Sequence, residues 1–235
     1  MGLRVLIVGY GRMGRQVEAL CETYACEVVE RLDIHNNTDG VWIDEARLPA
    51  VDVAIDFSTA EATVVNLPRL AAAGINTVIG TTGWNAEVDR MKQVVQDAGI
   101  GVVVSANFSI GVTLFHGIVE RAARMFGQLD EFGAWIHEAH HAAKIDAPSG
   151  TAIALRDAIR QAEYAAPIDV SSTRVGSTPG THTVGFDGPF ETVTLTHTTR
   201  DRATFARGAL EAARWVTGKR GWYTMRDVLG LEQEP

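Results

Sequence analysis

Short apolar runs alternate with amphipathic stretches along the first half of the chain. Runs at residues 3–8, 27–32, 53–57, 76–79 and 100–104 are rich in β-branched side chains and lack polar alternation, as buried parallel strands do. Between these runs, apolar residues recur every three or four positions, which predicts helices. Repeated strand–helix units predict a doubly wound parallel sheet of an α/β protein.

Local signals refine two of the predicted helices. In the helix expected over residues 60–73, Pro68 is expected to bend or interrupt the chain because proline has no amide N–H. Asn85 is expected to cap the next helix, and Gly99 is expected to end it. Neither signal changes the predicted order of strands and helices.

The pattern changes after residue 107. A long amphipathic helix is expected to end at Gly127, and apolar residues then alternate with polar ones at 132–136, 181–186 and 191–198. Alternation with polar side chains on one face predicts open-faced strands, of which the last two are expected to be antiparallel. The second half therefore predicts an α+β domain with an open mixed sheet.

The last part of the chain returns to the helical pattern of the first half. A helix is expected over residues 205–216, and the apolar tail at 225–230 is expected to fold back onto the first domain. We therefore expect one domain from residues 1–107 and 205–235, interrupted by an inserted domain over residues 108–204.

A glycine-rich turn follows the first strand and leads directly into a helix. Such a turn needs glycine for a tight bend, for close approach of a pyrophosphate, and for helix–strand packing. Asp33 ends the second strand 19 residues after Gly14, where a ribose-binding carboxylate is expected. The GxGxxG spacing alone is weak, but this context favours a Rossmann-type dinucleotide site over an incidental glycine turn. The residues involved are Gly9, Gly11, Arg12, Met13 and Gly14.

Polar segments follow three further strands. Residues 56–59, 80–83 and 105–109 all come directly after predicted strands. In a doubly wound sheet, ligands bind outside the carboxyl ends of the strands. Each segment alone fits an ordinary turn, but together they outline a pocket at one edge of the sheet.

The segment from Glu138 to Asp146 holds the densest group of reactive side chains. It contains His140, His141 and Lys144, and the run Pro-Ser-Gly-Thr that follows opens an amphipathic helix with Ser149 as the expected N-cap. A helix start offers N–H groups and a positive dipole end to an anion. Proton-transfer groups, cations and an anion cradle suit a small, negatively charged substrate that must be bound and protonated.

Other interpretations of this segment remain open at this point. A His-His pair is often structural or part of a metal site, and the segment also fits an ordinary polar loop. His140 and His141 are adjacent, so on a strand they would point to opposite faces. The chain contains no CxxC spacing that would complete a metal site. We therefore expect no metal.

Composition and charge limit the classes of partner that the chain is expected to bind. The chain has 235 residues, a formal net charge of −8 and an estimated pI of about 5.4, which argues against nucleic acid or an anionic membrane as the main partner. No apolar run approaches a membrane span, and the first run is too short for a secretion signal. Cys21 and Cys26 are expected to be reduced and buried. A cytoplasmic location is expected.

Several motifs of the chain resemble those of a known family. The segment Glu138-Ala-His-His-Ala-Ala-Lys-Ile-Asp-Ala-Pro-Ser-Gly-Thr-Ala152 resembles the signature of the dihydrodipicolinate reductases. Further similarities lie at residues 9–15, 80–83, 106–109, 205–210 and 227–231. The resemblance implies NADH- or NADPH-dependent reduction of dehydrated 4-hydroxy-tetrahydrodipicolinate, a small cyclic dicarboxylate, in lysine and diaminopimelate biosynthesis. It also implies a homotetramer built through the sheet of the second domain.

The resemblance implies roles for the residues of the signature. His140 matches the family's proton donor and acceptor, and Lys144 matches its proton donor. His141 matches a substrate contact, while Gly150 and Thr151 match the backbone groups that hold a substrate carboxylate. Quenching the charge that hydride transfer leaves on the substrate requires such proton carriers.

The resemblance also implies cofactor contacts beyond the glycine turn, together with some departures. Asp33 matches the acid that binds the adenosine ribose, and Thr113 stands where the family usually has asparagine. The pair 105–106 is Ser-Ala where Ala-Pro is common, and few residues separate Asp33 from the third strand. The implied loop contacts are Gly80, Thr81, Thr82, Ser105, Ala106, Asn107 and Phe108.

Asp33 also predicts the choice of cofactor. A carboxylate at this position binds both ribose hydroxyls of NADH and repels a 2′-phosphate. Ile34 and His35 follow it, where an enzyme that prefers NADPH would be expected to carry arginine. Arg12 in the glycine turn could still contact a phosphate. We predict the use of both cofactors, leaning towards NADH.

Two other functions remain open from the sequence. The chain could be a different NAD(P)-dependent dehydrogenase of similar build that acts on an amino or imino acid. It could also be a non-catalytic nucleotide-sensing module, for which His140 and Lys144 would be dispensable.

Overall fold

The computed structural model describes residues 2–43 and 48–231, which form two compact units. The first unit combines the chain up to Ile110 with the chain from Ala203 onward. The inserted unit is the segment Gly111–Arg202.

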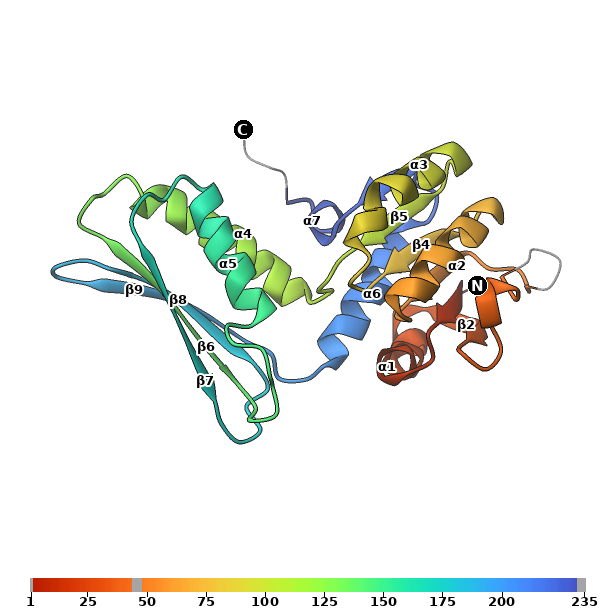
Figure 1. The fold of residues 1–235 in the computed structure, drawn as a ribbon, viewed down its shortest axis with the longest axis horizontal. Coiled ribbons are helices and arrows are strands. Elements are labelled where there is room, and N and C mark those ends of the chain that lie inside the picture. The colour runs from red at the N-terminus through yellow and green to blue at the C-terminus, as the bar shows by residue number, and fades with distance from the viewer. Residues whose placement is uncertain (1, 44–47, 232–235) are drawn as a thin grey trace. The chain divides into compact units, whose positions relative to one another are not determined.

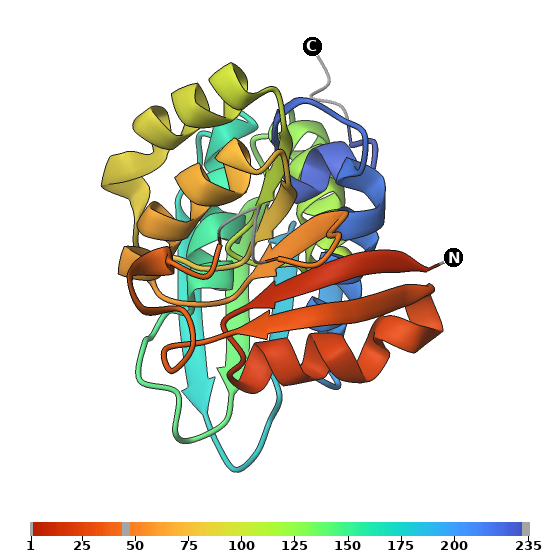
Figure 2. The same cartoon turned by 90° about the vertical axis from the view of Figure 1, so that its right-hand side faces the viewer.

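The first unit is built on a six-stranded parallel sheet with the strand order β10-β5-β4-β3-β1-β2. Its early strands are the red to orange ribbons of Figure 2. The doubly wound sheet predicted from the sequence is confirmed, and the short strand β10, which was not predicted, adds an edge to it. The strands are β1 (Leu3–Val8), β2 (Cys26–Leu32), β3 (Val53–Asp56), β4 (Asn76–Ile79), β5 (Gly101–Val104) and β10 (Gly221–Tyr223).

Helices cover both faces of this sheet. On one face, Val5 and Ile7 of β1 pack with Val17 of α1 (Arg12–Cys21) and with the small side chains of α6 (Ala203–Val216). On the other face, Leu6 packs with Leu70 of α2 (Ala60–Ala72), and α3 (Val88–Ala98) contributes its own apolar residues beside α2. Because the strands are buried on both sides, their sequences are continuously apolar.

Two details of the first unit differ from the sequence predictions. Helix α2 continues through Pro68 without interruption, and Leu67 and Leu70 on either side of the proline are fully buried. Burial of two leucines at about 1.5–3 kcal/mol each can offset a proline cost of about 3 kcal/mol. Asn85 does not cap α3: it begins the short turn η3 (Asn85–Glu87), and α3 starts at Val88 without a side-chain cap.

The remaining short elements of the first unit hold its ends and turns. The turns η1 (Glu22–Tyr24) and η2 (Thr38–Gly40) flank β2, and α7 (Met225–Val228) follows β10. Met225 is buried in the cluster that contains α1 and α6, as expected for a tail that folds back onto this domain. Both cysteines are free and buried.

The inserted unit is built on a four-stranded mixed sheet with two helices on one face (Figure 1). The order is β7-β6-β8-β9; β6 and β7 are parallel, whereas β8 is antiparallel to both β6 and β9. The elements are α4 (Ile110–Phe126), β6 (Gly133–His140), α5 (Gly150–Gln161), β7 (Ile168–Arg174), β8 (Thr181–Asp187) and β9 (Thr192–Thr198). Strand β7 was not predicted, because its last five residues have no clear apolar alternation.

The two faces of this sheet differ in chemistry. The covered face carries Ile136, Val184 and Phe186, which pack against residues of α4 and α5 such as Leu155. The opposite face, here called the open face, carries cross-strand pairs of threonines whose hydroxyls are 3.0 and 3.1 Å apart. Its members include Trp135, Thr181, Thr183, Gly185, Thr196 and Thr198.

No helix in the described ranges is both long and apolar enough to cross a membrane. The cytoplasmic location expected from the sequence stays a prediction.

Candidate active site

The glycine turn of the first unit is shaped by close backbone contacts. Gly9 has a φ of +90°, and a Cβ there would lie 2.5 Å from the backbone of Phe57. A Cβ on Gly14 would lie 2.4 Å from the carbonyl oxygen of Gly9, whereas one on Gly11 would meet nothing within 4 Å. Helix α1 begins at Arg12 without a side-chain cap. The turn thus fits a dinucleotide pyrophosphate, which needs open backbone and N–H groups at a helix start.

Asp33 lies directly after β2, in a small turn. One of its carboxylate oxygens accepts a hydrogen bond from the amide of His35 at 2.8 Å, and its own amide donates to Asn36 at 2.7 Å. Ile34 is 79% exposed. The turn orients the carboxylate, and the ribose contact itself stays a prediction.

Asp56 organises the loops at the carboxyl ends of β3 and β4. Its buried carboxylate accepts hydrogen bonds from the amide and hydroxyl of Ser58 at 2.8 and 2.6 Å, and from the hydroxyl of Thr81 at 3.1 Å. Burial raises the pKa of Asp56, and these hydrogen bonds oppose the rise. The Thr81 carbonyl accepts from Trp84 at 2.8 Å. The predicted loop residue Thr81 therefore holds the loop together, while Thr82 is exposed.

The loop after β5 is stabilised in a similar way. The Ser105 hydroxyl donates to the Asn107 carbonyl at 2.7 Å, and the Asn107 side chain accepts from the amide of Ser109 at 2.8 Å. Phe108 is buried, and a Cβ on Gly208 of α6 would lie 1.7 Å from the Phe108 carbonyl oxygen. The Phe108 side chain is thus part of the core, and Gly208 is required for the approach of α6. Ala106 is exposed.

Glu138 is the centre of the candidate site in the inserted unit. Its side chain is fully buried on the covered face of β6, yet several donors reach it. Arg174 of β7 donates through both terminal nitrogens at 2.9 and 2.7 Å, and the amide of Ser149 donates at 3.2 Å. His140 Nδ1 forms a further, short hydrogen bond with it. A buried carboxylate with this many donors is held as an anion.

The donors decide the charge of Glu138. Burial alone would raise the pKa of this carboxyl, but hydrogen bonds from Arg174, Ser172 and His140 lower it to about 2. The carboxylate therefore remains ionised at neutral pH.

His140 is held on one side and open on the other. Its side chain is 12% exposed, and its Nδ1 atom contacts Glu138. A Cβ on Gly180 would lie 3.1 Å from His140 Nε2, so a larger residue at that position would crowd this nitrogen. The ring also lies edge-on to His182, with centroids 5.1 Å apart.

Lys144 pairs with a different acid from His140. Its ammonium donates to both carboxylate oxygens of Asp146 at 2.7 and 2.9 Å. Arg174, which binds Glu138, also donates to the Asp146 backbone carbonyl at 2.5 Å. The structure therefore connects the two predicted catalytic residues through Arg174 rather than by a direct bond.

The start of α5 lies next to these groups. Ser149 caps the helix by accepting a hydrogen bond from Ala152 at 3.2 Å, as predicted. The pKa of Asp146 is lowered chiefly by the hydrogen bond from Lys144, and the Gly150 amide contributes to the shift. Lys144 and the helix start thus already share one carboxylate, which is the chemistry expected for holding a substrate carboxylate.

His182 of β8 is a residue that the sequence predictions missed. It is buried, and its Nε2 atom lies 3.0 Å from the Ser149 hydroxyl. Burial, together with the nearby His140, lowers the pKa of His182 to about 4, so the ring is neutral at neutral pH. Alternation with Val184 and Phe186 placed His182 on the apolar face and could have identified it. No local signal could have identified Arg174.

Glu138, His140 and His182 bring ligand atoms within 4.8 Å of one another, a set that could hold a metal ion. The carboxylate already accepts two hydrogen bonds from a guanidinium, which would repel a metal cation at the same oxygens. The prediction of no metal is retained.

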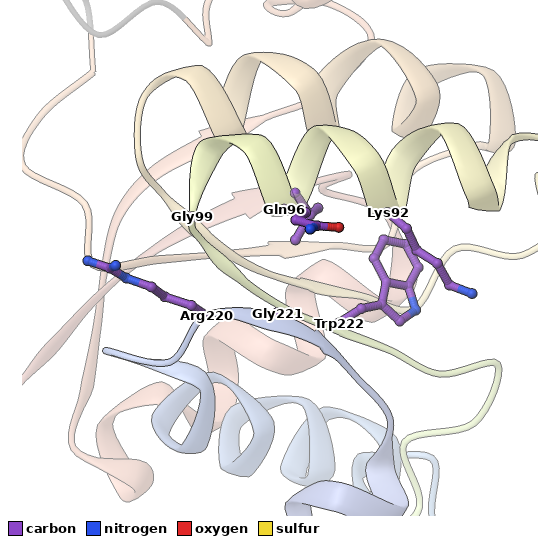
Figure 3. A pocket seen from close by; sticks show the side chains of 7 residues that line it. Lys92, Gln96, Gly99, Arg220, Gly221 and Trp222 are labelled. Carbon is purple, nitrogen blue, oxygen red and sulfur yellow. The ribbon is translucent and has the colours of Figure 1, made fainter.

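A pocket of about 460 Å³ elsewhere in the first unit contains none of the predicted site residues. Figure 3 shows its lining residues, which come from α3 and the glycine after it, and from the segment 220–222 at the start of β10. Gly221 begins β10, so this pocket lies at the opposite end of that strand from its carboxyl end. Ligands of doubly wound sheets bind at the carboxyl ends, so this pocket is not the candidate dinucleotide site.

Known protein families match both parts of the chain. Residues 3–108 match the family model described as dihydrodipicolinate reductase, N-terminus, and residues 111–229 match the corresponding C-terminus. A 4-hydroxy-tetrahydrodipicolinate reductase of Methanocorpusculum labreanum is 38% identical over 258 residues, covering 97% of this chain and all of that protein. One of Christiangramia forsetii is 32% identical, covering 97% of this chain and 98% of that protein.

Solved structures agree at the level of the fold. A dipicolinate-bound dihydrodipicolinate reductase from Paenisporosarcina superposes with a TM-score of 0.80 at 23% identity, covering 95% of this chain and 98% of that chain. An engineered D-amino acid dehydrogenase superposes with a TM-score of 0.57 at 17% identity, covering 100% and 97%. The second likeness is limited to the general architecture.

Proposed function

The chain belongs to the dihydrodipicolinate reductase family, and from that premise we propose that it is an NAD(P)H-dependent 4-hydroxy-tetrahydrodipicolinate reductase of lysine and diaminopimelate biosynthesis. Its substrate is dehydrated 4-hydroxy-tetrahydrodipicolinate and its product is tetrahydrodipicolinate. The observation that carries the proposal is the segment 138–151, in which an oriented histidine, a lysine and a helix start lie together.

The residues of the inserted unit hold the substrate and move a proton. A bound nicotinamide cofactor supplies the hydride, and the resulting negative charge on the substrate must be quenched. Lys144 and His140 are suited to this task, as an ammonium donor and an imidazole that can relay a proton. His141 and the amides of Gly150 and Thr151 are suited to hold the substrate carboxylates.

The cofactor is held chiefly by backbone groups of the first unit. The segments 80–82 and 105–108 lie in loops whose polar side chains stabilise the loops themselves. The glycine turn offers backbone that no side chain covers at Gly11. Asp33 is proposed to bind the adenosine ribose, so NADH is used at least as well as NADPH.

The open face of the inserted unit is proposed as the interface of a homotetramer. It presents aligned threonine pairs and Trp135, whose ring lies against Gly185 so closely that a Cβ there would approach it to 2.2 Å. An exposed sheet face of this kind fits packing against a second copy. Light scattering of the purified protein would test the assembly.

A coupled assay tests the function. Pyruvate and aspartate semialdehyde are supplied with the synthase that condenses them, and loss of NADH absorbance is followed after the protein is added. Loss that depends on the synthase supports the reductase. Oxidation of amino acids with NAD⁺, without turnover of the synthase product, would instead favour an amino acid dehydrogenase, and cofactor binding without either activity would favour a nucleotide sensor.

A further inference from the structure

We propose that Glu138, fixed by Arg174, is a positioning residue that sets the tautomer and the direction of His140, and that Gly180 keeps the reactive nitrogen uncovered. The role of the histidine in turnover rests on the proposed function. Which nitrogen of the His140 ring carries the hydrogen does not depend on the proposed function, and it can be measured separately.

The Glu138 carboxylate allows only one tautomer of the His140 ring. An ionised carboxylate only accepts hydrogen bonds, so the hydrogen between Glu138 and His140 must belong to Nδ1 of the histidine. The remaining nitrogen, Nε2, is then the atom that accepts or releases a proton. It is the atom that faces the space left by Gly180, which has a φ of +130°.

The carboxylate cannot rotate away from this task. One of its oxygens accepts from Arg174 Nη1 and from His140, while the other accepts from Arg174 Nη2 and from the Ser149 amide. Arg174 is itself tied to the Asp146 carbonyl. Three segments, β6, β7 and the start of α5, therefore converge on the group that orients one histidine.

The other charged and titratable groups near the ring are consistent with this role. His182 of β8 is neutral and bonds Ser149 rather than Glu138, so it does not compete for the carboxylate. His197 of β9 and His116 of α4 influence the electrostatics of His182. Among the described residues, Glu138 is the acid whose carboxylate forms a hydrogen bond with the His140 ring.

The variant Glu138→Gln should reverse the tautomer. A glutamine amide has one accepting and one donating end, and each end of this site already meets donors. At the Ser149 end both partners are fixed donors, Arg174 and a backbone amide. The other end meets one fixed donor, Arg174 Nη1, but its second partner, His140, can move its hydrogen to Nε2 and accept from the amide. The side-chain NH₂ therefore favours the histidine end, and the reactive nitrogen loses its accepting lone pair.

The test uses ¹⁵N-histidine NMR of the full-length protein at alkaline pH, with His140 assigned from the signal lost in His140→Gln. The wild type should carry the hydrogen on Nδ1, and a wild-type ring protonated on Nε2 would overturn the proposal even if Glu138→Gln fails to fold. Glu138→Gln should shift the hydrogen to Nε2, whereas Glu138→Asp, which keeps an accepting carboxylate, and the exposed control Glu131→Gln should not.

Turnover provides a second reading of the same variants. By analogy with carboxylates that orient catalytic histidines elsewhere, kcat of Glu138→Gln should fall roughly 10²–10⁴-fold, while the substrate KM changes far less. Glu138→Asp should recover part of the loss. An unchanged kcat in a folded Glu138→Gln protein with the reversed tautomer would show that His140 orientation does not matter. If the wild type has the predicted tautomer but no reductase activity, the proposed function fails while the positioning role stands.

Discussion

The two units use their polar side chains in different ways. In the first unit, Asp56, Thr81 and Ser105 lie at the carboxyl ends of strands, but their side chains bond the loops themselves. In the inserted unit, Glu138 and Asp146 bond the side chains that are proposed to react. The first unit thus offers shaped backbone to a ligand, whereas the inserted unit offers oriented charges.

This difference predicts how each unit responds to substitution. A unit that binds through backbone should be sensitive to added atoms at glycine and tolerant of changes in exposed side chains. A unit that works through charged side chains should lose turnover when single polar atoms are removed, while its affinity for the cofactor persists.

The largest effect is expected from the two proposed proton carriers. His140→Gln and Lys144→Ala should each lower kcat by roughly 10²–10⁴-fold, the usual contribution of a general acid or base. NADH affinity, measured by fluorescence titration, should stay near the wild-type value because both residues lie in the inserted unit. Lys92→Ala, a lysine on α3 of the first unit, serves as the control. Full turnover by both variants would remove them from the mechanism.

The second-largest expected effect is a loss of stability in mild acid. This loss should arise in the inserted unit. The folded-state pKa of His182 is depressed from 6.5 to about 4, so the unfolded chain binds its proton first and stability falls as pH drops below about 6.5. At 1.36 kcal/mol per pKa unit, the free energy of unfolding should fall by roughly 2 kcal/mol between pH 7 and pH 5 from this group.

Urea titrations at several pH values check the His182 prediction. His182→Gln should flatten the dependence in this window, whereas the exposed His35→Gln should leave it unchanged. Glu138 should add a further loss only between about pH 4.5 and pH 2. Equal slopes for the wild type and His182→Gln would contradict the assignment of a buried neutral ring.

Substitutions at the start of α5, which is proposed to hold a substrate carboxylate, should produce a selective loss of substrate affinity. Thr151→Pro deletes one N–H of the helix start, and a hydrogen bond to a charged group contributes about 1.5–3 kcal/mol. The substrate KM should therefore rise by about 10- to 100-fold, with NADH binding retained. Gly150→Val should act in the same direction by crowding the approach. The matched variant Thr151→Ala keeps the N–H and should behave like the wild type.

Substitutions in the glycine turn should have the opposite selectivity, because they lower the affinity for the cofactor rather than for the substrate. Gly14→Ala places a Cβ 2.4 Å from the Gly9 carbonyl oxygen, and overpacking of this kind costs about 1–3 kcal/mol. Both folding stability and NADH affinity should fall. At Gly11 a Cβ meets nothing within 4 Å, so Gly11→Ala should weaken NADH binding without lowering the melting temperature. Equal melting temperatures for the two variants would show that Gly14 is not required for packing.

The smallest effect is expected in the choice of cofactor. NADH should be used at least as well as NADPH, because Asp33 repels a 2′-phosphate and Ile34 offers no cation to bind one. Ile34→Arg should shift the ratio of kcat/KM values towards NADPH. Steady-state kinetics with both cofactors check this, and a large advantage for NADPH in the wild type would mean that Asp33 does not bind the ribose.

The sequence predicted features that depend on local pattern. The parallel strands, the glycine turn and the Ser149 cap follow from residues that are neighbours in the chain. The interruption expected as one possible effect of Pro68 does not occur, because tertiary burial of Leu67 and Leu70, not the local preference of proline, decides the continuity of α2.

The site itself was only partly predictable for the same reason. The segment 138–151 was visible in the sequence, but the partner that fixes Glu138 was not. Arg174 is 36 residues away and reaches Glu138 only because β7 pairs in parallel with β6. Strand β7 was missed, so nothing in the sequence placed an arginine beside that carboxylate.

The most direct test of the proposed reduction is isotope transfer from the cofactor. NADH deuterated at the transferable position is incubated with the protein, the synthase and its two substrates, and the tetrahydrodipicolinate formed is analysed by mass spectrometry. The proposed function predicts one deuterium per product molecule with the wild type, and almost no product with His140→Gln. Product without deuterium, or cofactor consumption without this product, would contradict it.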